Sequence, residues 1–209
     1  MYNRYSLTAP LHNLILILLL FSLTACSEST GLTRLKDDAV ILSFGDSLTR
    51  GTGAKEPDSY PSVLSALTGR HVINAGIPGE LSEDGLKRLP GLLDEHQPDL
   101  LILCHGGNDI LRKKDLNQMG ENIRAMIALA QDRNIPVVLL GVPQPSIFLS
   151  SAEIYREIAE STGVVFIEDV IADVLGDKEL KSDTVHPNGA GYRRIAEQVY
   201  STLSDAGAI

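Results

Sequence analysis

Short, continuously apolar runs alternate along this chain with amphipathic stretches of helical period. Strands that are buried on both faces are apolar throughout, whereas an amphipathic helix repeats its apolar residues every three or four positions. Because alternating strands and helices build a parallel sheet covered on both faces, we expect one three-layer α/β/α domain with a five-stranded parallel sheet. The predicted strands are residues 39–44, 71–74, 100–104, 136–140 and 164–167, and the predicted helices are residues 60–67, 82–95, 118–133, 152–161 and 189–203.

The predicted helix at residues 82–95 has two local features. Ser82 stands at its start and is predicted to be the N-cap, because a serine oxygen accepts a hydrogen bond from the first helical turn. Pro90 lies inside the same stretch. A proline removes one helical hydrogen bond, so the sequence leaves open whether this helix is unbroken.

The charge and cysteine content of the chain exclude some functions. The 209 residues include 27 acidic and 18 basic residues, which gives a formal net charge of −9. An acidic chain without a basic run argues against nucleic-acid binding. The two cysteines, Cys26 and Cys104, lie in no Cys/His spacing typical of zinc, so the sequence predicts no metal site. Cys104 lies within a predicted strand and is interpreted as a buried core residue.

The N-terminal segment has the layout of a secretory signal. Arg4 is the only charged residue before an apolar stretch from Leu14 to Leu23, and small residues lead from there to Cys26. A positive region, a short apolar core and a small-residue cleavage site define such a signal. The alternative is a membrane anchor, but about 20 apolar residues are needed to span a bilayer and this core is shorter. We therefore expect residues 1–25 to be removed.

The sequence Gly45-Asp46-Ser47-Leu48 directly follows the first predicted strand. Open α/β sheets bind ligands at the carboxyl ends of their strands. A serine there can act as a nucleophile if a base activates its hydroxyl, and its backbone N–H can stabilise the resulting oxyanion. The alternative is an ordinary turn, which this composition also favours.

A candidate base and its partner lie near the C-terminus, in the sequence Asp183-Thr184-Val185-His186-Pro187-Asn188. An aspartate three residues before a histidine can hold the imidazole in one tautomer while the ring faces a serine. The alternative is that Asp183 or Asn188 caps the C-terminal helix. A metal site formed by Asp183 and His186 would lack further ligands.

Two glycine-rich segments follow other predicted strands. Gly106-Gly107-Asn108-Asp109 carries a side-chain amide, at Asn108, that can donate to an oxyanion. The segment at residues 74–80, NAGIPGE, offers a backbone N–H from Gly76 or Gly79. Each segment also has an alternative interpretation as a turn that uses glycine for its backbone freedom.

Taken together, GDSL, the glycine of NAGIPG, GGND and DTVHPN resemble the four sequence blocks of the SGNH hydrolase (GDSL-type esterase/lipase) superfamily, in its order. The resemblance spans residue 39 to the last predicted helix. Within the superfamily, SFGDSLTRGTG and GLKRLPGLLDEHQPDLLILCHGGNDILR are most similar to the arylesterase, acyl-CoA thioesterase I and lysophospholipase L1 group.

The resemblance implies a flavodoxin-like sheet of strand order 2-1-3-4-5. It implies Ser47 as nucleophile, His186 as base and Asp183 as the residue that orients His186. The oxyanion hole would consist of the Ser47 N–H, the Gly79 N–H and the Asn108 side chain, with Gly79 aligned in preference to Gly76. Asp46 and Asp109 match positions that brace loops, and His105 is expected to support the site from behind.

The implied function is hydrolysis of carboxylic esters and thioesters through an acyl-enzyme intermediate, without metal or organic cofactor. We expect broad arylesterase-, lysophospholipase- or thioesterase-like specificity. The alternatives are a carbohydrate O-deacetylase of the cell envelope and a non-catalytic envelope lipoprotein. The loop at residues 142–149 is expected to cover the substrate, with Ile147, Phe148 and Leu149 contacting an acyl chain, unless these side chains fold into the core.

The sequence Leu23-Thr24-Ala25-Cys26 resembles a bacterial lipobox. It implies lipidation of Cys26, a tether at residues 26–38 and a hydrolase domain at residues 39–209. Ser27 follows the cysteine, which implies an outer-membrane lipoprotein facing the periplasm; the alternative is a soluble secreted or periplasmic protein. The expected partners are therefore an ester substrate and, through the lipid, a membrane.

Overall fold

The computed structural model describes Met1 and residues 31–144 and 149–209, and it contains the expected five-stranded parallel sheet. The sheet order is β2-β1-β3-β4-β7, which is the predicted order 2-1-3-4-5 once the parallel strands are counted along the chain. The strands are β1 (Val40–Gly45), β2 (His71–Gly76), β3 (Leu100–Cys104), β4 (Val137–Leu140) and β7 (Val165–Ile167).

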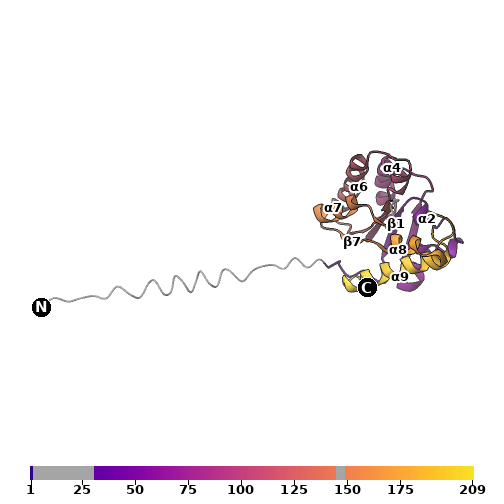
Figure 1. Ribbon diagram of the computed structural model, residues 1–209. Coiled ribbons are helices and arrows are strands. Elements are labelled where there is room, and N and C mark those ends of the chain that lie inside the picture. The colour runs from indigo at the N-terminus through magenta and orange to yellow at the C-terminus, as the bar shows by residue number, and fades with distance from the viewer. Residues whose placement is uncertain (2–30, 145–148) are drawn as a thin grey trace.

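Helices cover both faces of the sheet (Figure 1). On one face α6 packs against both α4 and α7, and on the other α9 packs against both α3 and α8. The three-layer α/β/α architecture is therefore confirmed. The first group comprises α4 (Ser82–His96), α6 (Leu116–Gln131) and α7 (Glu153–Thr162), and the second comprises α3 (Tyr60–Thr68), α8 (Val170–Gly176) and α9 (Gly189–Asp205).

Several short elements, which the sequence analysis did not predict, lie in the connections. Each has fewer than six residues, too few to show a helical or strand period. They are the helices α2 (Ser47–Arg50) and α5 (Gly107–Leu111), the 3-10 helices η2 (Glu56–Asp58) and η3 (Lys178–Leu180), and the two-stranded hairpin of β5 (Pro143–Gln144) and β6 (Ser150–Ser151).

Helix α4 corrects one prediction and answers an open question. Its N-cap is Leu81, which makes no side-chain capping bond, so the prediction of Ser82 as N-cap was wrong. The Ser82 hydroxyl instead donates to Asp109 Oδ1 at 2.8 Å. The helix continues through Pro90, and the buried side chains of Leu89 and Leu93 hold it on the core at that point.

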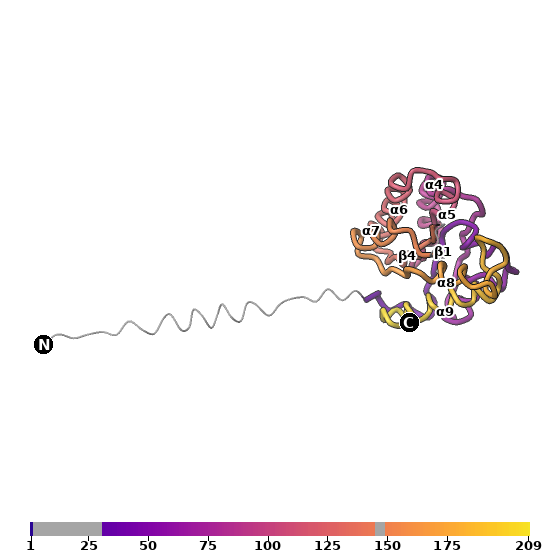
Figure 2. Tube along the Cα trace, in the orientation of Figure 1, coloured from indigo at the N-terminus to yellow at the C-terminus, as the bar shows by residue number. Residues whose placement is uncertain are grey.

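The segment that begins at residue 31 lies beside the C-terminal end of the chain (Figure 2). Leu32 N donates to Ala206 O at 2.9 Å, and Leu35 N donates to Ala208 O at 2.8 Å. Leu35 is buried, so part of the expected tether, residues 31–38, packs on the domain. Cys26 and residues 2–25 lie outside the described residues. Among the residues that are described, we find no helix with the length and apolar character needed to cross a membrane.

The carboxyl ends of three neighbouring strands, β2, β1 and β3, meet at one level of the sheet. Gly45 is in register with Gly76 of β2 and with Cys104 of β3. A Cβ atom at Gly45 would overlap the Cys104 carbonyl oxygen, so only glycine permits this close approach. The loops that follow the three strands therefore begin beside one another, and they carry Ser47, Gly79 and Asn108.

Candidate active site

Ser47 is the first residue of α2, directly after β1 and its N-cap Asp46. Asp46 Oδ1 accepts a hydrogen bond from the Leu48 N–H at 3.0 Å, and Gly51 ends the helix in a left-handed conformation with φ of 90°. Backbone N–H groups in the first turn of a helix have no acceptor within the helix. Ser47 therefore presents its hydroxyl and its backbone donor together at the carboxyl edge of the sheet.

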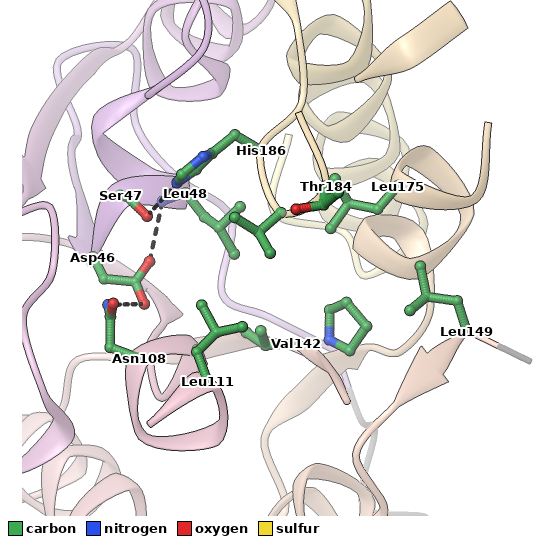
Figure 3. Close-up of a pocket in the computed structure, with 13 residues that line it drawn as sticks. Asp46, Ser47, Leu48, Asn108, Leu111, Val142, Leu149, Leu175, Thr184 and His186 are labelled. Carbon is green, nitrogen blue, oxygen red and sulfur yellow. Dashed lines mark hydrogen bonds between the residues drawn. The ribbon is translucent and has the colours of Figure 1, made fainter. Parts of the chain in front are cut away.

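The Ser47 hydroxyl belongs to a chain of three side chains. His186 Nε2 lies 3.0 Å from Ser47 Oγ, and His186 Nδ1 lies 2.8 Å from Asp183 Oδ2. An ionised carboxylate only accepts hydrogen bonds, so Nδ1 carries the imidazole proton and Nε2 accepts from the serine hydroxyl. Figure 3 shows the His186 ring directed at Ser47. The structure thus brings together the three residues that the sequence analysis grouped.

The carboxylate of Asp183 is fixed by more than the imidazole. Its Oδ1 atom accepts hydrogen bonds from the backbone N–H of Val185 at 2.8 Å and of His186 at 2.9 Å. Partial burial raises the pKa of Asp183, but these bonds and the His186 side chain outweigh it and hold the pKa below its ordinary value. Asp183 is therefore an ionised acceptor at neutral pH.

The loop that carries Asp183 and His186 is closed on itself before α9. Ser182 N donates to His186 O at 2.9 Å, and Asn188 N donates to Leu180 O at 2.9 Å. Asn188 is the N-cap of α9, because its Oδ1 accepts from Gly191 N at 3.0 Å. Of the two capping alternatives, the structure selects Asn188 and leaves Asp183 for the imidazole.

The side-chain amide of Asn108 lies beside Ser47 at the start of α5. Its Nδ2 donates to Asp46 Oδ2 at 3.2 Å and to the Glu80 carbonyl oxygen at 3.1 Å. Burial raises the pKa of Asp46 above its ordinary value. Both amide hydrogens have protein acceptors here, so an oxyanion would share one of them or replace an acceptor.

The two candidate backbone donors after β2 differ in what they bind. Gly76 N donates to Asn74 Oδ1 at 3.1 Å, so its N–H is occupied. In the described part of the chain, Gly79 N donates to no protein acceptor. Gly79 has a φ of 81°, a left-handed conformation that glycine adopts without strain, and its carbonyl oxygen accepts from Arg112 Nη2 at 3.0 Å. The geometry therefore leaves the Gly79 N–H free for a ligand.

Asp109 braces the loops of the site. Its carboxylate accepts from Ser82 N at 2.9 Å and from Ser82 Oγ at 2.8 Å, and Asn122 Nδ2 donates to the same hydroxyl at 3.0 Å. These bonds tie α5 to the start of α4. Asp109 therefore has the bracing position expected of it.

A pocket of about 130 Å³ opens beside Ser47. Asp46, Ser47, Asn108 and His186 lie at one end (Figure 3). Leu111, Val142, Leu149 and Leu175 extend toward the other end, where Thr184 lies beside Leu175. Ile147 and Phe148, which were expected to contact substrate, lie outside the described residues, and Gly79 does not line this pocket. The lining comprises Asp46, Ser47, Leu48, Gly107, Asn108, Leu111, Val142, Pro143, Leu149, Leu175, Thr184, Val185 and His186.

The sequence analysis did not identify Leu111, Val142, Leu175 or Thr184 as pocket residues. They come from α5, the loop after β4, α8 and the loop before α9, which meet only in the folded protein. Of the four, only Val142 lies in a segment for which a substrate contact was predicted.

Comparison with known proteins finds relatives that cover most of the chain. The sequence profile described as "GDSL-like Lipase/Acylhydrolase family" matches residues 43–194. The chain is 31% identical over 201 residues to an arylesterase of Vibrio mimicus, covering 91% of this chain and 96% of the relative. It is 28% identical over 171 residues to thioesterase 1/protease 1/lysophospholipase L1 of Escherichia coli, covering 78% and 82%.

Among solved structures, the psychrotrophic esterase EstA from a Pseudoalteromonas species, inhibited by monoethylphosphonate, has a similar fold. The TM-score is 0.72 and the sequence identity 25%, and the match covers 80% of this chain and 98% of that protein.

Proposed function

This chain belongs to the GDSL-like lipase/acylhydrolase family of hydrolases, and we propose that it is a serine esterase whose reaction passes through an acyl-Ser47 intermediate. The observation that carries the proposal is the hydrogen-bonded order Asp183–His186–Ser47 at the mouth of an apolar pocket. This arrangement supplies a nucleophile, a base and a group that orients the base.

The chemical steps follow from the hydrogen bonds. Ser47 Oγ attacks the ester carbonyl while His186 Nε2 takes its proton, and the imidazolium then protonates the departing alcohol or thiol. Asp183 stabilises the imidazolium and keeps Nδ1 protonated. Water then attacks the acyl-enzyme while His186 takes its proton, and the imidazolium returns that proton to Ser47 Oγ as the acid is released.

We assign the oxyanion to three donors: the Ser47 N–H, the Gly79 N–H and the Asn108 amide. The free N–H of Gly79 and the occupied N–H of Gly76 support the choice between the two glycines. Donors that are fixed where negative charge develops lower the barrier most. In this assignment the Asn108 amide shares one hydrogen with the oxyanion or exchanges the Asp46 or Glu80 acceptor for it.

The pocket favours an acyl or aryl group over a sugar. Its wall beyond Ser47 consists largely of aliphatic side chains, and its volume of about 130 Å³ is comparable to an apolar cavity of about 150 Å³ that accepts benzene. We therefore propose short acyl esters, aryl esters and acyl thioesters as substrates, in preference to acetylated carbohydrate.

A graded ester panel tests this function. Purified protein is assayed on p-nitrophenyl esters from acetate to dodecanoate, on an acyl thioester, on lysophospholipid and on an acetylated sugar, with Ser47→Ala beside it. Ser201→Ala, an exposed serine on α9, is the matched control. We expect hydrolysis by the wild type and by Ser201→Ala only, and a fluorophosphonate adduct on Ser47. Undiminished hydrolysis by Ser47→Ala would contradict the mechanism.

We also propose that Cys26 is lipidated and anchors the protein in the cell envelope, facing the periplasm. The sequence around Cys26 supports this. The described N-terminal residues precede β1 at its amino end, where Ala39 N donates to Lys36 O, whereas the pocket lies at the carboxyl ends of the strands. An anchor at Cys26 would thus attach at the pole opposite the pocket. Membrane fractionation of the wild type and of Cys26→Ala tests the anchor, and an unchanged membrane fraction in Cys26→Ala would contradict it.

A further inference from the structure

A largely buried polar cluster, formed by Glu80, Arg88 and His105, lies behind the candidate active site. The Glu80 carboxylate accepts two bonds from Arg88, Nε to Oε1 at 2.8 Å and Nη2 to Oε2 at 2.7 Å, and His105 Nε2 lies 3.1 Å from Oε2. The side-chain exposure is 7% for Glu80, 24% for Arg88 and 0% for His105. The mechanism derived above uses none of these side chains, so their burial needs a separate explanation.

His105 is held in one orientation from several sides. Its Nδ1 accepts from the Gly106 N–H at 2.9 Å, so Nε2 carries the proton and donates to Glu80. The Phe44 ring lies 5.7 Å from the imidazole ring, centroid to centroid. The space on the remaining side exists because residue 85 is glycine, where a Cβ atom would overlap the imidazole.

Arg88 connects the cluster to strand β2. Its Nη2 also donates to the Ala75 carbonyl oxygen at 3.0 Å, and its guanidinium lies 4.3 Å from the centroid of the Phe44 ring. A guanidinium that makes a two-bond fork with a carboxylate and stacks on an aromatic ring has little freedom. The Glu80 side chain is therefore fixed relative to strands β1 and β2.

The cluster connects the two loops that carry donor groups. Glu80 directly follows Gly79, and its carbonyl oxygen accepts from Asn108 Nδ2 at 3.1 Å. His105 begins the turn that leads through Gly106 to Asn108. The carboxylate of one loop is thus bonded to the imidazole of the other, directly behind the point where the two loops meet.

We propose that Glu80, Arg88 and His105 are positioning residues, which hold the Gly79 N–H and the Asn108 amide in the geometry that stabilises the oxyanion. The proposal rests on the proposed function of the site. Misplacing a catalytic group by about 1 Å can cost about 100-fold in rate. A neutral pair would hold the loops less firmly, because hydrogen bonds to charged partners are about twice as strong as neutral ones.

The first test compares charge-removing variants with exposed neighbours on the same helix. Glu80→Gln and Arg88→Met are assayed beside Glu83→Gln and Lys87→Met, which remove the exposed Glu83–Lys87 pair. We expect kcat to fall about 10- to 100-fold in the first two with KM nearly unchanged, because the oxyanion forms only in the transition state. Both control variants should keep the wild-type kcat. A folded Glu80→Gln protein with wild-type kcat would overturn the proposal.

A conservative pair keeps the test decisive if Glu80→Gln does not fold. His105→Leu removes the donor to Glu80, whereas His105→Gln retains an N–H on a side chain of similar reach. We expect His105→Gln to recover much of the kcat that His105→Leu loses, at similar thermal stability. Equal losses in the two variants would indicate a purely structural role and would overturn the proposal.

A double-mutant cycle and a spectroscopic readout separate this proposal from the proposed function. If Glu80 acts through Asn108, the combined loss of kcat in Glu80→Gln with Asn108→Ala will be smaller than the product of the two single losses. The side-chain amide NMR signals of Asn108, identified by their absence in Asn108→Ala, should shift in Glu80→Gln and stay in place in Glu83→Gln. Unchanged signals in Glu80→Gln would overturn the positioning role, whereas undiminished activity in Ser47→Ala would overturn the proposed function alone.

Discussion

The Nε2 atom of His186 lies 3.0 Å from Ser47 Oγ, although the two residues are 139 positions apart in the chain. Two contacts hold their loops together. The Tyr192 hydroxyl in the first turns of α9 donates to the Thr52 carbonyl oxygen at 2.8 Å, and Gly53 packs so closely on Ser182 that no larger residue would fit. The serine–histidine geometry thus depends on the packing of α9 against the segment that follows α2.

Replacing Asp183 by asparagine should abolish most activity without unfolding the protein. The oxygen of the introduced amide would keep the two backbone hydrogen bonds, but its NH2 group would donate to His186 Nδ1 and so favour the tautomer with the proton on Nε2. That tautomer cannot accept the Ser47 proton, so we expect kcat to fall about 1,000- to 10,000-fold. Ester hydrolysis by Asp183→Asn and by the exposed Asp205→Asn measures this, and a loss below about 10-fold in Asp183→Asn would contradict the assigned order.

Removing the side-chain amide of Asn108 should lower kcat about 100- to 1,000-fold, the effect typical of losing one oxyanion donor. KM should change little, because the donor acts on charge that develops in the transition state. Asn117→Ala, an exposed asparagine on α6, is the matched control. Near-full kcat in a folded Asn108→Ala protein would mean that the amide only forms structural hydrogen bonds with Asp46 and Glu80 and does not act in catalysis.

The strands and long helices could be predicted because each carries its own period and apolar face. β1, for example, is buried along nearly its whole length, and α6 buries Ile123, Met126 and Ile127 on one side. Local motifs at strand ends and before the last helix made Ser47, Asp183 and His186 candidates, and the resemblance of the whole motif set to a known family assigned their roles. The fold then brings these motifs to one edge of the sheet.

The parts that were not predicted depend on distant contacts. Ser82 has the residue type of an N-cap, but a carboxylate 27 positions away, Asp109, binds its hydroxyl and its N–H. No local sequence pattern predicts the pairing of Glu80 with His105 either, because the two residues are 25 positions apart. Such relationships follow from which loops meet, and a single sequence carries no direct signal of that.

Shortening Leu149 should change which acyl chain is preferred. Leu149 lines the pocket at the end away from Ser47 and is 38% exposed (Figure 3). Leu149→Ala would remove apolar contact from longer chains, at about 0.8 kcal/mol per methylene that loses burial. We expect kcat/KM to fall several-fold for octanoate and stay unchanged for acetate. Leu67→Ala on α3, also 38% exposed, should change neither value, and equal losses on both esters in Leu149→Ala would count against this contact.

Two glycines of α4 should respond oppositely to alanine. A Cβ atom at Gly91 meets no neighbour within 4 Å, so Gly91→Ala should raise the free energy of unfolding by about 0.5–1 kcal/mol through helix propensity. A Cβ atom at Gly85 would overlap the His105 imidazole, so Gly85→Ala should lower it by about 1–3 kcal/mol. Urea denaturation of the wild type and both variants measures whether the free energy of unfolding rises in Gly91→Ala and falls in Gly85→Ala. A stabilised Gly85→Ala protein would show that the contact between α4 and His105 is looser than the structure describes.

The protein should lose stability in acid as the Glu80 carboxylate becomes protonated. Burial raises the pKa of this carboxyl, but the hydrogen bonds from His105 and Arg88 and the charge of Arg88 outweigh it and set the pKa to about 2, below the value of 4.5 for a free glutamate. Because the folded pKa is depressed, the stabilisation is complete above about pH 4.5 and is lost as the pH falls toward 2. At about 1.36 kcal/mol per pKa unit, less the screening by solvent at the loop edge, this contribution is about 1–3 kcal/mol.

Denaturation of the wild type and of Glu80→Gln between about pH 7 and pH 2.5 measures this contribution. The stability gap between the two proteins should narrow with acid, whereas the exposed Glu83→Gln variant should show no such gap. A stability gap for Glu80→Gln that stays constant over this range would mean that Arg88 and His105 do not lower the pKa of Glu80.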